Sequence, residues 1–176
     1  MDALQWGISI IVAIITFIGG RFYERRKLEQ ENRLKLLEPI EEWIDKCSRI
    51  ISIIGSELPT FAEGHHESSI YNESEILETE KFIEENRDKV FGILNSTALQ
   101  TFATKKISIR LSNLILQLER DITINLLPKH SYLAYQKSKG EPHGKELFES
   151  LTLVKQIKSN IVEIHSCISQ LKTKYN

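Results

Sequence analysis

The sequence predicts an all-α protein in which one amino-terminal transmembrane helix continues into a cytoplasmic bundle of about four helices. Two observations lead to this fold class. The run ALQWGISIIVAIITFIGG, residues 3–20, contains no charged side chain and is followed at once by the basic cluster RFYERRK. In the rest of the chain, apolar residues recur every three or four positions, which is the spacing of amphipathic helices rather than of strands.

The apolar run is long enough for a membrane span. As a helix it would extend about 27 Å, which matches a thin hydrocarbon core. A cleaved signal peptide would carry basic residues before the run, whereas here Asp2 precedes it and Arg21 follows it. A buried core helix would show a polar face, but the only polar side chains inside the run are Gln5, Ser9 and Thr16. The excess of Lys and Arg after the run places the amino terminus outside and the remaining chain in the cytoplasm.

The small and polar residues of this run share one face of the predicted helix, within a sector of about 80°. Such a stripe allows neighbouring helices to pack closely or, in a ring of copies, to line a water-filled pore. The alternative is that Ser9 and Thr16 bond to their own helix backbone and that Gln5 lies among lipid headgroups. The predicted pore-lining or helix-packing residues are Gln5, Ser9, Ala13, Thr16 and Gly20.

We divide the chain into a transmembrane helix (1–20), a basic juxtamembrane helix (21–38) and a cytoplasmic helical bundle (39–176). The juxtamembrane part lacks glycine and proline and is rich in strong helix formers, so we expect the first helix to continue through it without a break. Its first basic residues are placed where anionic lipid headgroups would attract them. The predicted headgroup contacts are Arg21, Arg25, Arg26 and Lys27.

The bundle begins at Pro39, which predicts a kink or a new helix because proline is costly inside a helix. An amphipathic helix follows and is predicted to end at Gly55. After it, residues 56–72 contain Pro, Gly and polar residues and are predicted to form a long loop. The apolar positions of the helix are Ile40, Trp43, Ile44, Cys47, Ile50, Ile51 and Ile54.

Neither a metal nor another cofactor is predicted. His65 and His66 stand beside Glu67, but adjacent side chains diverge, and a structural zinc takes four ligands. Cys47 and Cys167 are the only cysteines, and they form no CxxC motif. Because both belong to the part assigned to the reducing cytoplasm, we expect no disulfide.

The middle of the chain is predicted to hold two more helices. The first begins at Ser74 and ends at a turn over 95–97, and the second spans 98–127 and is stopped by Pro128. Residues 129–144 are predicted to be a basic loop with two tyrosines. Stacking on nucleic-acid bases is one interpretation of that composition, and a plain surface connection is the simpler one.

The last helix has the most regular pattern. Its apolar residues follow one another in steps of four, three and three and then alternately of four and three, which is the spacing of a packing seam. The helix is therefore either the centre of the core or a helix that packs against a neighbouring copy. The seam residues are Leu147, Leu151, Val154, Ile157, Ile161, Ile164, Ile168, Leu171 and Tyr175.

Charge is distributed unevenly although the net charge is only −1. Residues 21–35 are basic, residues 57–89 hold ten acids against three bases, and residues 105–174 hold twelve bases against six acids. This separation favours head-to-tail contacts between copies or a basic surface for an anionic partner.

The segment KSNIVEIH near the end of the chain holds Asn160 and His165. Helical bundles with such a late polar motif resemble the HEPN superfamily, many members of which cleave RNA. The superfamily motif has an arginine followed a few residues later by histidine, often with asparagine after the arginine. Here Lys158 lies near the arginine position, and lysine lacks the planar fork that binds a phosphate in two places. Asn160 and His165 are therefore degenerate catalytic candidates, and no enzyme is predicted.

The size, the predicted span, the helical body and this motif together resemble the small membrane accessory proteins of type VI CRISPR systems. The resemblance implies a ring-shaped homo-oligomer that permeabilises the bacterial inner membrane in support of RNA-guided antiviral defence. The implied partners are the lipid bilayer, other copies of the chain, and an RNA-guided effector or RNA; no small-molecule substrate is evident. The alternatives are a membrane-tethered HEPN-type ribonuclease that uses His165 and a non-catalytic membrane adaptor.

Overall fold

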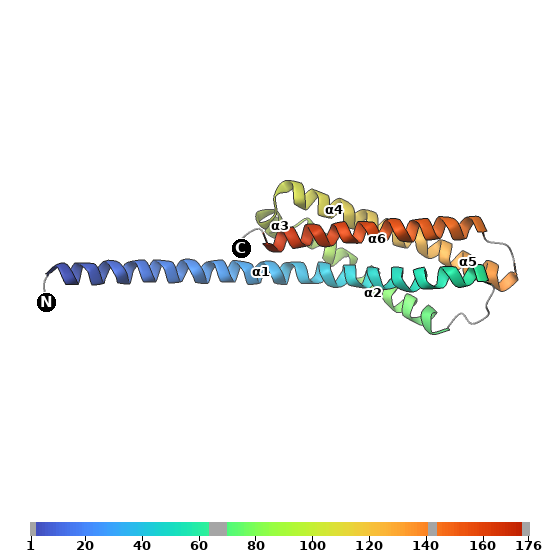
Figure 1. The fold of residues 1–176 in the computed structure, drawn as a ribbon, viewed down its shortest axis with the longest axis horizontal. Helices are drawn as coiled ribbons and strands as arrows, with labels where there is room; N and C mark the ends of the chain where they lie inside the picture. Colours follow the sequence, from blue (N-terminus) through green and yellow to red (C-terminus); the bar gives the residue numbers. More distant parts are fainter. Residues whose placement is uncertain (1–2, 64–69, 141–143, 174–176) are drawn as a thin grey trace.

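The computed structural model describes residues 3–63, 70–140 and 144–173, and all regular secondary structure in these residues is helical. This confirms the all-α prediction. Figure 1 shows a long first helix that lies along a bundle of the remaining helices and extends beyond it. The elements are α1 (Ala3–Glu63), α2 (Ile70–Leu94), α3 (Thr97–Phe102), α4 (Lys105–Arg120), the π-helix η1 (Asp121–Leu126), α5 (Leu127–Lys139) and α6 (Gly144–Thr173).

The predicted transmembrane helix requires correction. In the part of the chain that the structure describes, no helix combines the length and the apolar character needed to cross a membrane. This finding contradicts both the predicted span over residues 1–20 and the single-pass inner-membrane location. Among the described side chains of α1, exposed apolar ones run from Val12 to Ile18, and charged residues follow from Arg21 onward. The side chains of Gln5, Ser9 and Ala13 lie outside the described residues.

α1 is one continuous helix of 61 residues that contains both Pro39 and Pro59. The prediction that the first helix continues unbroken through residue 38 is confirmed, whereas the predicted start or kink at Pro39 does not interrupt it. Each proline removes one backbone donor, but buried side chains flank both positions, so packing against the bundle holds the helix together. These buried neighbours are Leu37, Ile40, Leu58 and Phe61.

The prediction that a helix ends at Gly55 is wrong, because α1 continues to Glu63. Gly55 instead lies where α6 passes close to α1. A β-carbon at this position would lie 3.3 Å from Cγ1 of Val154 and 3.7 Å from Nζ of Lys158. The missing side chain therefore permits the close approach of two helices.

The loop predicted over residues 56–72 is mostly wrong. The chain stays helical through Glu63, and α2 begins at Ile70 rather than Ser74. Residues 64–69, which include the two adjacent histidines, lie outside the described residues. Among the residues described, no group of His, Cys, Asp and Glu is arranged to hold a metal ion.

The helix predicted over 98–127 is divided into α3, α4 and η1, and the chain continues helically past Pro128. In η1 the backbone follows a wider π turn, so that the N–H of Leu127 bonds to the carbonyl of Ile122. Pro128 then occupies the first turn of α5, where a missing donor costs little. The predicted loop 129–144 is therefore helical through Lys139.

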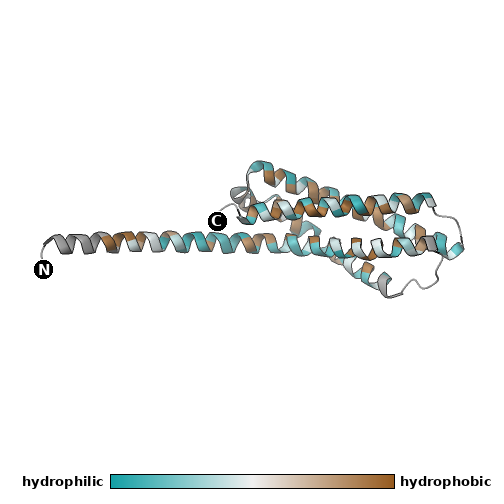
Figure 2. Cartoon of the chain, viewed as in Figure 1, coloured by the Kyte–Doolittle hydropathy of each residue, from teal (hydrophilic) through white to brown (hydrophobic). Residues whose placement is uncertain are grey.

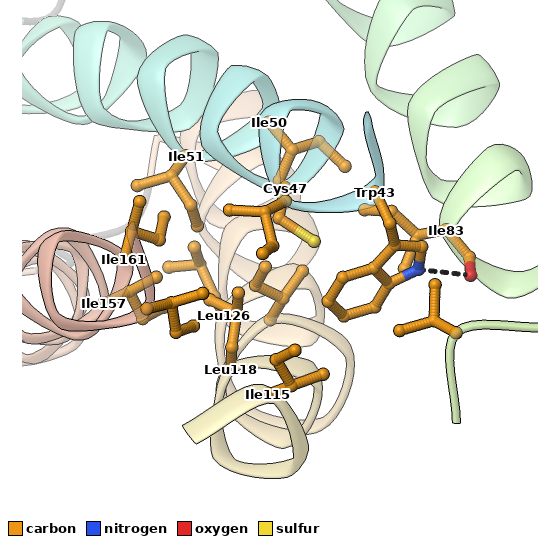
Figure 3. Packing of buried hydrophobic residues seen from close by; sticks show 14 of the residues in the cluster. Trp43, Cys47, Ile50, Ile51, Ile83, Ile115, Leu118, Leu126, Ile157 and Ile161 are labelled. Atoms are coloured by element: carbon orange, nitrogen blue, oxygen red, sulfur yellow. Dashed lines mark hydrogen bonds between the residues drawn. The ribbon is translucent and has the colours of Figure 1, made fainter. Parts of the chain in front are cut away.

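The core is built on one face of α1, as the spacing predicted. Figure 3 shows side chains of α1, α2, α4, η1 and α6 meeting around Cys47. Trp43 is fully buried, and its Nε1–H donates to the carbonyl oxygen of Ile83 on α2 at 3.0 Å. All seven predicted apolar positions from Ile40 to Ile54 are completely buried.

The seam of α6 belongs to the same core. Its described residues are buried, apart from the half-buried Leu151, and α6 contacts both α1 and α4. Of the two interpretations of the seam, the structure supports a central core helix. Tyr175 lies outside the described residues.

Replacing Trp43 by alanine should destabilise the bundle strongly, because the substitution leaves a cavity and removes a buried hydrogen bond. We expect a loss of about 3–5 kcal/mol in the free energy of unfolding, measured by urea denaturation followed by circular dichroism. The matched control is Phe148→Ala, since that ring on α6 is 71% exposed. Its effect should stay within about 0.5 kcal/mol, and equal losses for both variants would contradict the assigned core.

Burial raises the pKa of the Cys47 thiol well above its ordinary value of 9.0, and the nearby Glu119 carboxylate raises it further. In the unfolded chain the thiol ionises at its ordinary pKa, so stability should fall as pH rises beyond that value. Relative to Cys47→Ala, the wild type should lose up to about 1.4 kcal/mol of unfolding free energy per pH unit in this range. Parallel pH profiles of the two proteins in urea denaturation would contradict the buried neutral thiol.

Candidate functional site

The outer part of α1, residues 3–36, projects from the bundle, and we call it the arm (Figure 1). From Val12 to Lys35 its described side chains are exposed, except for the half-buried Arg33. Among the described side chains of α1, the first buried one is that of Leu37. From Val12 to Lys35 the arm is therefore exposed on all sides.

Among the described side chains of the arm, those from Val12 to Phe22 include large exposed apolar ones. Hydropathy falls from this stretch toward the bundle, where hydrophilic residues predominate (Figure 2). Ile15 is 65% exposed and Phe17 is 64% exposed. Apolar surface of this density on one short stretch is typical of an interaction site. The hydroxyl of Thr16 donates to the carbonyl of Val12 at 2.8 Å, which is the backbone bond considered above as the alternative to a pore lining. Gly20 is exposed as well.

Basic residues follow the apolar end. The guanidinium of Arg21 lies 5.2 Å from the ring centre of Phe17, and that of Arg26 lies 5.1 Å from the ring centre of Phe22. Nε of Arg25 lies 3.7 Å from Oε1 of Glu29, and both side chains are exposed. These are weak surface contacts that leave the cations accessible. Like Arg21, Arg25 and Arg26, Lys27 is exposed, and a contact of these residues with lipid headgroups stays a prediction.

The HEPN-like pair does not form a joint site on α6. Five residues turn a helix by about 140°, so Asn160 and His165 leave α6 in different directions. Asn160 is half-buried, with its Nδ2 enclosed and without a hydrogen-bond partner among the described residues, whereas His165 is exposed. Lys158, which stands near the arginine position of the motif, lies beside Gly55 of α1.

A more enclosed histidine lies at the other end of the bundle. Nε2 of His130 on α5 lies 2.7 Å from Oε2 of Glu57 on α1, and each side chain is only 13% exposed. The imidazole also meets the ring of Phe61 edge-on, with 5.8 Å between the ring centres. The sequence interpretation missed this cluster because it assigned residues 56–72 and residues 129–144 to loops. The i, i+4 spacing of Glu57 and Phe61, continuing the α1 pattern, was the signal that could have revealed it.

This cluster forms one wall of a cleft between α1, α2 and α5, with a volume of about 500 Å³. The lining combines apolar side chains with Glu73 and Glu80 of α2. Lys137 is the single lysine in the lining; its Nζ lies 5.1 Å from the ring centre of Phe61. We call this region the acidic cleft. The apolar lining residues include Phe61, Ile76, Leu77, Leu127, Pro128 and Ala134.

Comparisons with known proteins give no assignment, because no family model, curated protein or solved structure matches this chain.

The two histidines should respond differently to substitution. His130→Ala leaves the largely buried Glu57 carboxylate without its imidazole partner, so we expect a loss of about 1–3 kcal/mol in unfolding free energy. His165→Ala removes an exposed side chain and should change stability by less than about 0.5 kcal/mol. Urea denaturation measures both variants. A wild-type RNA cleavage activity that disappears in His165→Ala would instead assign a catalytic role to the HEPN-like motif.

Proposed function

We propose that this chain is a non-catalytic helical protein that acts by self-assembly, with the arm as its interaction element. The observation that carries the proposal is the exposure of the arm: large apolar side chains from Val12 to Phe22 project from a helix that extends past the bundle. The bundle provides a rigid base that holds this helix in place. Self-assembly was also the part of the sequence interpretation that did not depend on a membrane span.

Energetics favour a partner for the arm. Most helical stability in proteins comes from packing an apolar face, and the arm has no such support within its own chain beyond its junction with the bundle. Burying one large apolar side chain contributes about 1.5–3 kcal/mol, so several exposed arm residues together help to offset the entropy that association costs. A second copy of the chain is a partner that is always present.

The biological setting that we propose is an accessory role in RNA-guided antiviral defence. Its support is the resemblance of the helical layout and of the Asn160 and His165 motif to accessory proteins of type VI CRISPR systems. A membrane pore is not part of the proposal, since it depended on the span that was corrected above. The different exposures of Asn160 and His165 give no support to the ribonuclease alternative.

Replacing Ile15 and Phe17 together by serine should weaken self-association on the order of 100-fold, because two large apolar side chains are lost from the contact. Sedimentation equilibrium of the full chain measures the association constant. The matched control is the double variant Phe148→Ser and Val162→Ser, which removes two apolar side chains that are exposed on the bundle. The control should associate like the wild type.

A wild-type chain that stays monomeric at high concentration would contradict the proposal. If that monomer then bound phospholipid vesicles through Ile15 and Phe17, the arm would be assigned to a lipid surface instead.

A further inference from the structure

We propose that the basic part of the arm of one copy docks into the acidic cleft of another copy, so that self-association is head-to-tail. This inference rests on the proposed self-assembly and specifies the two surfaces that meet. The docking segment spans residues 21–27 and presents aromatic and basic side chains together.

The two surfaces have opposite charge. Residues 12–36 hold six bases against three acids, while α2 holds seven acids against three bases. Within the cleft, Glu73 and Glu80 have no ion-pair partner among the described residues. Several other acids of the bundle are already paired: Glu75 with Arg49, Glu119 with Arg87, and Glu41 with Lys172. The cleft acids are therefore available to incoming cations.

The cleft also matches the docking segment in shape and polarity. Its volume of about 500 Å³ lies in the range of protein sites that hold one ligand-sized group. Its apolar lining residues suit an aromatic ring such as Phe22 or Tyr23, each of which is more than half exposed on the arm. The Phe61 ring already accepts one cation, Lys137, and the two rim glutamates leave a surplus of negative charge for Arg25 and Arg26.

The arm cannot reach the cleft of its own chain. The docking segment and the α1 wall of the cleft belong to the same continuous helix, and the 35 residues from Arg26 to Phe61 place them about 50 Å apart. The arm extends past one end of the bundle, whereas α5 and the carboxyl-terminal end of α1 lie toward the other (Figure 1). Residues of these two segments line the cleft. Only a different copy can bring the complementary surfaces together. Each copy has one arm and one cleft, so the contact is heterologous and generates a ring or an open chain.

Charge reversal and recombination test this contact in the full chain. The arm variant carries Arg25→Glu and Arg26→Glu, and the cleft variant carries Glu73→Lys and Glu80→Lys. Each variant alone should lose at least tenfold in association constant at about 0.01 M salt, where the screening length is about 30 Å. An equimolar mixture should recover association, because the reversed arm meets the reversed cleft. Sedimentation velocity with one variant fluorescently labelled measures the mixed species.

The matched control is Glu78→Lys with Glu84→Lys, which changes the net charge of α2 equally at exposed positions that do not line the cleft. The control should keep wild-type association. Circular dichroism should show that all variants retain the helical fold.

Three results would overturn the inference. The first is equal weakening by the control, and the second is failure of the mixture to associate. The third is association that responds to Ile15→Ser and Phe17→Ser but to neither charge reversal; this would leave self-assembly standing and indicate arm-to-arm packing. A monomeric wild type would overturn the inference together with the proposed function.

Discussion

The structure depends on the continuity of α1. One helix of 61 residues provides a face of the core along its inner part and an exposed arm along its outer part. The inner part is fixed by Trp43, whose ring is completely buried and whose Nε1–H bonds to α2. Because the helix does not end at the edge of the bundle, the same packing that stabilises the core also sets the direction of the arm.

This continuity separates two surfaces of different chemistry. The arm is apolar at its outer end and basic beyond Gly20, while the cleft between α1, α2 and α5 is lined by glutamates and apolar side chains. A flexible joint at Pro39 would allow one surface to fold onto the other. A straight helix prevents it, so that the exposed groups of one copy are left for a partner. Rigidity thus favours association over intramolecular closure.

The histidine that the sequence motif points to is not the one that the fold encloses. His165 stands in the HEPN-like segment and is exposed, whereas His130 stands in a segment interpreted as loop and is held against Glu57. The difference arises because the chain passes from the wider turn of η1 directly into α5, where Pro128 occupies the first turn and His130 follows within the helix. A local irregularity in one helix therefore positions the most enclosed histidine that the structure describes.

Apolar periodicity by itself determined the all-α class and the buried faces of α1 and α6. Residues spaced three or four positions apart share one face only when the chain is helical, so that face can be buried against a core. Charge counts likewise identified the basic and acidic segments. The predicted helix ends at Gly55 and before Pro128 were wrong, because the prediction relied on the tendency of glycine and proline to break isolated helices. Only the tertiary structure decided that packing overrides these local preferences, which made Gly55 a close contact with α6 and Pro128 a helix start. The cleft also required the fold, because its walls come from three helices distant in sequence.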